Sequence, residues 1–152
     1  MPLNDLLAAH AVLPALKAKN KKQALQELAA LVAAECGRGE REIFETLWHR
    51  ERLGSTGVGR GVAIPHGKLA KLDRLVGLFA RLEKPIDFES LDGEPVDLIF
   101  LLLAPEGAGA DHLKALARIA RLLRDEKIAE QLRAARDESA LRALLTSPAA
   151  AA

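Results

Sequence analysis

The sequence predicts a single α/β domain with a mixed parallel and antiparallel sheet, and three observations lead to that prediction. Residues 96–103 form an almost continuous apolar run, typical of a strand buried on both faces with helices above and below it. Amphipathic helical segments alternate with short apolar runs, which favours α/β layers. The strands are few and some look joined as hairpins, so an all-parallel sheet is not expected. The 152 residues, 49% hydrophobic and 28% charged, suit one core.

The N-terminal segment is expected to contain a short helix followed by an edge strand. The helix is predicted over residues 4–10, with Asn4 as its N-cap. The strand follows over residues 11–16. Because Pro14 has no amide hydrogen to donate to a neighbouring strand, this strand should lie at an edge of the sheet or carry a break.

Two longer helices follow, and the second leads directly into a glycine-rich loop. Asn20 is the expected N-cap of the first, whose apolar residues recur at helical spacing until about Cys36, where Gly37 ends it. The second helix is predicted from about Gly39 to Arg52. Cys36 is the only cysteine of the chain, so an intrachain disulfide is impossible, and its apolar helical surroundings indicate a small core residue.

The second half of the chain is expected to alternate strands with helices. Strands are predicted over residues 62–64, 75–82 (ended by Lys84-Pro85) and 96–103. A flexible loop over residues 105–110 precedes a helix capped by Asp111, and two further helices are predicted over residues 126–135 and 139–145. We therefore expect one domain over residues 1–146 and a frayed alanine-rich tail over residues 147–152.

The charge balance does not point to a nucleic acid or a membrane as a partner. Lys and Arg number 22 against 21 Asp and Glu, so the net charge is only +1. This balance gives no argument for a nucleic-acid partner or an anionic membrane. The N-terminus lacks the basic start and apolar run of a secretory signal, and the longest apolar run is too short for a membrane-spanning helix. We expect a cytoplasmic protein with no membrane insertion.

His66 is the residue around which we expect the function to be organised. It follows Pro65 at the end of a short apolar run, and residues 54–61 upstream hold four glycines in eight positions. Glycine lets backbone amides converge on an anion, and a neutral imidazole is nucleophilic through the nitrogen that lacks a proton. Phosphoryl transfer to histidine needs in-line access and donors for the equatorial oxygens. The pattern permits such a site, and it equally permits a tight turn with a surface histidine.

Candidate donors for an anion at His66 come from the loop and from the helix before it. They are the hydroxyls of Ser55 and Thr56 and the guanidinium of Arg50 or Arg52. His112 opens a helix beyond the buried strand, and because open α/β sheets bind ligands at the carboxyl ends of strands, it could converge on His66. Taken alone, His112 fits a solvated residue at a helix start.

Other kinds of site fit the sequence less well. No H-x-x-x-H or H-E-x-x-H spacing occurs, so no metal site is predicted. Residues 54–61 lack the Gly-Lys-Ser/Thr ending of a nucleotide-binding loop, and no helix follows them. His10 and His49 fall in predicted helices without a glycine loop, and we interpret both as structural or surface residues.

Taken together, these residues resemble the enzyme IIA family of the bacterial phosphotransferase system, in its fructose/mannitol and nitrogen-regulatory branch. The phosphohistidine signature of that family is an acidic or amide residue, six free positions, and then apolar-Gly-x-x-apolar-Ala-apolar-Pro-His-Gly. Glu51 and residues 58–67 match every specified position. The resemblance extends from the first strand to about Leu145 and includes Pro95 to Leu98 and Asp111 to Leu113.

The resemblance implies a fold of about five strands in a mixed sheet with flanking helices, and it implies roles for particular residues. His66 would accept the phosphoryl group, and His112 would orient it or stabilise its charge without being phosphorylated. Arg50 would contact the phosphoryl group, although Arg52 lies nearby as an alternative. The phosphoryl-binding loop would comprise Gly54, Ser55, Thr56, Gly57 and Gly67. No cofactor or metal is implied, and the nitrogen of His66 that attacks stays open.

The resemblance also implies a phosphocarrier that takes its phosphoryl group from a histidine-phosphorylated carrier protein of the HPr type. We expect a protein that stands without an attached IIB or membrane domain, and the segments 54–57 and 64–69 look more like the nitrogen-related regulators. We therefore expect a regulator whose phosphorylation state is detected by target proteins. One alternative is a sugar-uptake enzyme IIA that passes phosphate to a IIB domain. A second is a protein-binding module of the same fold in which phosphorylation of His66 plays no part.

Overall fold

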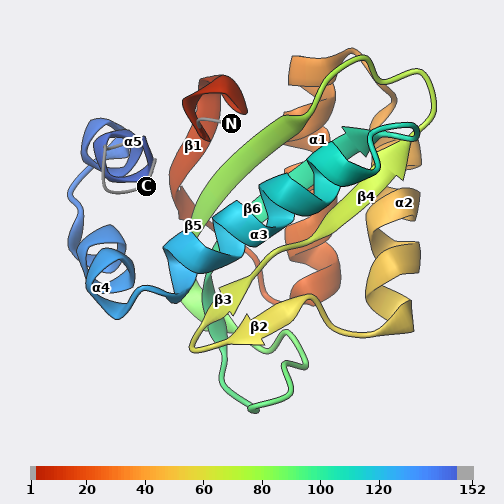
Figure 1. Cartoon of the computed structure of the whole chain (residues 1–152). Helices are drawn as coiled ribbons and strands as arrows, with labels where there is room; N and C mark the ends of the chain where they lie inside the picture. The colour runs from red at the N-terminus through yellow and green to blue at the C-terminus, as the bar shows by residue number, and fades with distance from the viewer. Residues whose placement is uncertain (1–2, 147–152) are drawn as a thin grey trace.

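The computed structural model describes residues 3–146, apart from the side chains of Asn4, Ala9 and His10. In these residues a six-stranded mixed sheet has the order β1-β5-β6-β3-β2, with β4 also paired to β6 (Figure 1). The strands are β1 (Leu7–Leu16), β2 (Gly57–Gly59), β3 (Val62–Ala63), β4 (His66–Leu69), β5 (Val76–Ile86) and β6 (Val96–Pro105). The helices are the 3₁₀ helix η1 (Leu3–Asp5), α1 (Lys21–Cys36), α2 (Glu40–Leu53), α3 (Ala110–Arg124), α4 (Glu126–Ala134) and α5 (Glu138–Leu145).

Strand β6 is the centre of the sheet, as its apolar run predicts. It pairs antiparallel with β5 on one side and parallel with β3 and β4 on the other. Residues 98–104 of this strand are all fully buried. Helix α3 crosses the front of the sheet and α1 lies behind it, with α2 beside α1 (Figure 1). The prediction of a mixed α/β domain with helices on both faces is confirmed.

Strand β1 forms one edge of the sheet, but it begins earlier than expected. The predicted helix over residues 4–10 is wrong, because only Leu3–Asp5 is helical and Leu7 already pairs with Gly77 of β5. Buried Leu6 and Leu7 join the core in this arrangement. The predicted edge position of Pro14 is confirmed, since β1 pairs within the described chain only with β5. The side chains of Asn4 and His10 lie outside the described residues.

Strand β5 extends past the proline that was expected to end it. The strand continues through Pro85 to Ile86, which pairs with Val96 of β6. The ladder between β5 and β6 is interrupted between Arg81 and Ile86, so no hydrogen bond is required from the amide position of Pro85. Two short strands were not predicted either, because β2 is Gly-Val-Gly and β4 is only four residues with one apolar side chain, so neither shows an alternating pattern.

The helix ends follow local sequence in most places. The side chain of Asn20 accepts a hydrogen bond from the Gln23 amide, and Gly37 ends α1 in the left-handed conformation with φ 68°, as predicted. Helix α3, however, begins at Ala110 with Gly109 as its N-cap, so the prediction of Asp111 as N-cap is wrong.

Cys36 is partly buried against the core. Among residues 3–146, no helix combines the length and hydropathy needed to cross a membrane.

Candidate functional site

His66 is positioned by a break in the sheet. Strands β3 and β4 both pair with β6, Ala63 opposite Ile99 and His66 opposite Leu102, and the break between them is Ile64-Pro65. Proline has no amide hydrogen, so it cannot donate in the ladder. The break is nevertheless held on both sides, because the Ile64 amide donates to the Thr56 carbonyl at 3.0 Å and the Leu102 amide donates to the Pro65 carbonyl at 2.9 Å. His66 therefore stands on a well-anchored backbone.

The imidazole of His66 is fixed by a bond to its own turn. Its Nδ1 lies 2.8 Å from the carbonyl oxygen of Ile64. A carbonyl oxygen only accepts hydrogen bonds, so Nδ1 carries the proton and Nε2 of the neutral ring carries the free lone pair. The ring is half-buried. In this tautomer Nε2 is the ring nitrogen whose lone pair is available.

The pKa of His66 is lowered from its ordinary value. Burial of the ring is the main cause, and the positive charge of Arg50 lowers the pKa further, while the bond to Ile64 and the negative charge of Glu51 act in the opposite direction. A lowered pKa keeps the imidazole neutral at pH 7, with its Nε2 lone pair available. The electrostatics thus favour nucleophilic chemistry at this ring.

His112 meets His66, as the sequence analysis expects. The chain reverses after β6, so the first turn of α3 returns toward β4, and the two ring centroids lie 5.7 Å apart at an interplanar angle of 67°. His112 is only 6% exposed, and its Nε2 has no hydrogen-bond partner among the described residues. The pKa of His112 is lowered by burial first, then by repulsion from His66 when that ring is protonated, and then by the positive charge of Lys68. An unpartnered nitrogen of this kind is suited to contact a group bound at His66.

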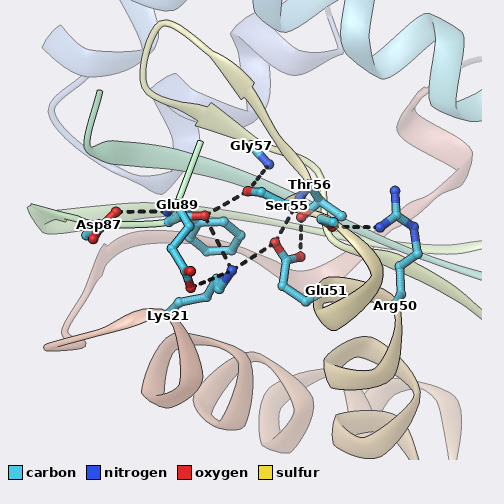
Figure 2. Close-up of polar contacts among 10 residues, drawn as sticks. Lys21, Arg50, Glu51, Ser55, Thr56, Gly57, Asp87 and Glu89 are labelled. Carbon is cyan, nitrogen blue, oxygen red and sulfur yellow. Dashed lines mark hydrogen bonds and ion pairs between the residues drawn. The ribbon is translucent and has the colours of Figure 1, made fainter. Parts of the chain in front are cut away.

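Of the two arginines at the end of α2, Arg50 is the one whose charge acts on His66. Successive helix residues are about 100° apart around the axis, so Arg50 and Arg52 lie on nearly opposite sides of α2. Arg50 is half-buried, donates from Nη1 to the carbonyl of Gly54 at 2.8 Å, and is close enough to shift the pKa of His66 (Figure 2). Arg52 is exposed and lines a cavity of about 360 Å³ together with Lys21, Glu51 and the loop residues Gly54 and Ser55. The geometry favours Arg50 over Arg52.

The hydroxyl groups of the predicted phosphoryl-binding loop are bonded to the protein itself. Ser55 Oγ donates to the Phe88 carbonyl at 2.7 Å and accepts from the Gly57 amide at 3.0 Å. Thr56 Oγ1 donates to Glu51 Oε2 at 2.6 Å. These bonds fix the shape of the loop. Whether the loop also contacts a phosphoryl group stays a prediction.

Gly67 is required by close packing. A Cβ atom at this position would lie 2.7 Å from Cγ2 of Thr46, so a side chain would push α2 away from β4. Arg50 and Glu51 are at the C-terminal end of the same helix. The absence of a side chain at Gly67 therefore helps to keep those residues close to the strand that bears His66.

Sequence reasoning missed the buried ion pair beneath the loop. Glu51 and Lys21 are both buried, and Lys21 Nζ lies 3.5 Å from Glu51 Oε1. A signal was present, because Ile43, Leu47 and Glu51 recur at helical spacing on the one buried face of α2, which puts a carboxylate where the pattern calls for an apolar residue.

The remaining histidines lie apart from this arrangement. His49 is exposed on α2, in keeping with a surface residue. The backbone of His10 belongs to β1, but its side chain is outside the described residues. In the part of the chain that the structure describes, no three His, Cys, Asp or Glu side chains are grouped to hold a metal ion. The candidate site therefore brings together the imidazole of His66, the imidazole of His112 and the guanidinium of Arg50.

Comparison with known proteins supports the resemblance of the signature. The sequence pattern of the family described as "Phosphoenolpyruvate-dependent sugar phosphotransferase system, EIIA 2" matches residues 5–147. The nitrogen regulatory protein of Bradyrhizobium diazoefficiens is 67% identical over 152 residues, covering 100% of this chain and 99% of the relative. That of Pseudomonas aeruginosa is 44% identical over 123 residues, covering 80% of each chain.

A solved structure agrees with this assignment. The crystal structure of the nitrogen regulatory protein IIA-Ntr from Neisseria meningitidis superposes with a TM-score of 0.91 at 37% identity. The match covers 95% of this chain and 99% of that one. From the match over residues 5–147 and these relatives, the chain belongs to the type-2 enzyme IIA family of the phosphotransferase system, with nitrogen regulatory proteins among its relatives.

Proposed function

We propose that this protein is a phosphocarrier that accepts a phosphoryl group on Nε2 of His66 from a histidine-phosphorylated carrier protein of the HPr type. The observation that supports this most directly is the bond between His66 Nδ1 and the Ile64 carbonyl, which leaves the Nε2 lone pair on a half-buried ring. The lowered pKa of His66 keeps that ring neutral at pH 7. Family membership supports a role in phosphoryl transfer.

The transfer step is an exchange between two imidazoles. The Nε2 lone pair forms a bond to phosphorus while the bond from phosphorus to the donor imidazole breaks, and that electron pair returns to the donor nitrogen. The His66 ring then carries the phosphoryl group and the Nδ1 proton together, so it is cationic. The Ile64 carbonyl is placed to stabilise that cation through the Nδ1 proton. Both partners are phosphoramidates, so the step is close to isoergic and reversible.

Arg50 and His112 have supporting roles in this proposal. Arg50 brings positive charge to the phosphoryl oxygens, and the unpartnered Nε2 of His112 orients the group or stabilises its charge. Replacing either residue by alanine should leave the fold intact and slow transfer by about 10²-fold, the usual cost of losing one such group. Transfer as fast as wild type in either variant would remove that residue from the mechanism.

We further propose that the phosphorylation state is the output, detected by regulatory target proteins in the cytoplasm. The names of the relatives support this, since those at 67% and 44% identity are both called nitrogen regulatory proteins. The first alternative is transfer onward to a sugar-specific IIB domain. The second is a regulator that binds proteins without phosphorylation of His66.

The test is incubation of the pure protein with phosphorylated HPr-type carrier, followed by detection of acid-labile, base-stable phosphate. Wild type and His49→Ala, an exposed histidine on α2, should be labelled, and His66→Ala should not be. Labelling that survives in His66→Ala would contradict the assignment, and no labelling of wild type would favour the protein-binding alternative. NMR should locate the phosphate on Nε2. Donation to a cognate IIB domain would instead support sugar uptake.

A further inference from the structure

A buried ion pair lies beneath the glycine-rich loop, and the chemistry proposed above does not use it. Figure 2 shows Glu51 between Lys21 and Thr56. The side chain of Glu51 is 1% exposed and that of Lys21 is 10% exposed. Lys21 Nζ also lies 3.4 Å from the Phe88 carbonyl and 3.2 Å from the carboxylate of exposed Glu89. The pair therefore joins α1, α2 and the loop after β5.

Both oxygens of the Glu51 carboxylate are bonded to the same loop residue. Oε1 accepts from the Thr56 amide at 2.8 Å, and Oε2 accepts from the Thr56 hydroxyl at 2.6 Å. Two hydrogen bonds donated by Thr56 to a charged carboxylate restrain the position of Thr56 more strongly than bonds to a neutral acceptor would. Thr56 is itself only 4% exposed, so water is not positioned to replace these bonds.

Thr56 leads to His66 by two further hydrogen bonds. The Thr56 carbonyl accepts from the Ile64 amide at 3.0 Å. The carbonyl of the same Ile64 then accepts from Nδ1 of His66 at 2.8 Å. A continuous chain of contacts therefore runs from Glu51 through Thr56 and Ile64 to the imidazole ring. No other side-chain hydrogen bond of the His66 ring is found in the described residues.

The buried charge is poorly explained by stability alone. Ile43 and Leu47 cover the same face of α2 with apolar side chains, and a buried ion pair is often no more stabilising than apolar residues of similar volume. An apolar residue at position 51 would fill the space but leave the Thr56 amide and hydroxyl without their acceptor. What the carboxylate uniquely supplies is a fixed position for Thr56, and through it for Ile64.

We propose that Glu51 is a positioning residue for phosphoryl transfer, which holds Thr56 and Ile64 so that the Ile64 carbonyl keeps the proton of His66 on Nδ1. Lys21 neutralises the carboxylate and has no direct part in the transfer. The inference rests on the proposed acceptance of phosphate at His66. It adds that the choice of nitrogen is controlled by a residue that touches neither the ring nor the phosphoryl group.

A pair of variants at Thr56 tests this with little change in volume. Thr56→Ser keeps both bonds to Glu51, whereas Thr56→Val keeps the shape and the amide but loses the hydroxyl. Glu51→Gln removes the charge, and Glu89→Gln, which alters only an exposed partner of Lys21, is the control. The tautomer of His66 is measured by ¹⁵N NMR of the imidazole in the unphosphorylated protein, and the transfer rate is measured with phosphorylated carrier.

Wild type, Thr56→Ser and Glu89→Gln should show a single Nδ1–H tautomer. Thr56→Val and Glu51→Gln should show a mixture of tautomers, with transfer slowed by about 10- to 100-fold, as expected when a reacting group is misplaced. The proposal would be overturned if the Glu51→Gln and Thr56→Val proteins melt at lower temperature but keep the wild-type tautomer and transfer rate. The contact between Glu51 and Thr56 would then have a structural role only. If Glu51→Gln fails to fold, the two Thr56 variants decide the question.

The tautomer measurement separates this inference from the proposed function. A wild-type protein that never takes phosphate would refute the phosphocarrier, while a tautomer shift in Thr56→Val would still show that the contacts position His66. Conversely, a protein that accepts phosphate normally in Thr56→Val and Glu51→Gln would keep the phosphocarrier and refute the role of Glu51.

Discussion

Two ion pairs of this protein, Lys21–Glu51 and Arg133–Asp97, differ in burial and in the groups that they bind. Under the glycine-rich loop, Lys21 and Glu51 are 10% and 1% exposed, and the carboxylate binds a backbone amide and a hydroxyl. At the start of β6, Arg133 of α4 binds the carboxylate of Asp97, with side chains 35% and 23% exposed. Each pair joins segments distant in sequence. The first pair is the more deeply buried, so losing one partner should cost more there than in the second.

The C-terminal helices are fastened by arginines throughout. Arg81 donates to the carbonyls of Pro14, Leu132 and Ala135, which ties the end of α4 to the sheet. Arg142 donates to the carbonyl of Ala8 at 2.7 Å, which holds α5 against β1. Such bonds attach one element to another without fixing the orientation of any reactive group. Under the proposal above, the cluster of Lys21 and Glu51 fixes the geometry at His66, whereas Arg81 and Arg142 attach the C-terminal helices to the sheet.

The largest expected effect is that of Lys21→Met. Removing the cation leaves the buried carboxylate of Glu51 without its countercharge, which should lower the free energy of unfolding by about 3–5 kcal/mol. Urea unfolding monitored by circular dichroism measures this. The double variant Lys21→Met/Glu51→Gln should recover a large part of the loss. A single variant less than about 1 kcal/mol below wild type would show that the pair is not electrostatically coupled.

Arg81→Met should have a smaller effect on stability and none on transfer. The change leaves the carbonyls of Leu132 and Ala135 without their donor at a partly buried position, which should cost about 1–3 kcal/mol in unfolding free energy. Phosphoryl transfer should keep its wild-type rate. Slower transfer in a fully folded Arg81→Met protein would contradict the separation between the two regions.

The pH dependence of the free energy of unfolding should arise from the two histidines of the candidate site, His66 and His112. The pKa values of His66 and His112 are both lowered, mainly by burial. When the pH falls below about 6.5, the unfolded chain binds protons first, so the stability present above that pH is lost as the pH falls through the folded pKa values. Urea unfolding between about pH 7.5 and pH 5 measures the slope. His112→Gln should flatten it, and an unchanged slope would contradict this origin.

The smallest expected effect is that of Arg60→Gln. Arg60 pairs with Glu126 at 2.8 Å, but the side chains are 69% and 75% exposed. Exposed pairs contribute little, so unfolding free energy should change by less than about 0.5 kcal/mol. Thermal unfolding at low and high salt checks this. A larger, salt-dependent loss would show that attachment of α4 depends on charge more than its exposure implies.

The sequence predicts elements well where one segment decides its own conformation. Asn20 and Gly37 bound α1 as expected, because capping depends on neighbouring residues alone. The predictions fail where a distant strand decides. Leu7 begins a strand because it pairs with Gly77 of β5, and Pro85 is accepted in β5 because the ladder to β6 is interrupted there.

The candidate site divides in the same way. The signature from Glu51 to Gly67 identifies His66, and its place after a glycine-rich loop is visible in the sequence. The buried contact between Glu51 and Lys21 is not visible in the sequence. The two residues are 30 positions apart, and their contact depends on the packing of α1 against α2. Only a charged residue on an apolar helix face hinted at them.

The sequence by itself determined the α/β class, the central buried strand and the position of the candidate nucleophile, because these follow from local spacing, caps and the conformational limits of glycine and proline. The tertiary structure alone decided the distance and angle between the rings of His66 and His112 and the contact of His66 Nδ1 with the Ile64 carbonyl. It also decided that Glu51 is buried with Lys21. The physical reason is that contacts between distant segments depend on how the elements pack, and local sequence does not specify that packing.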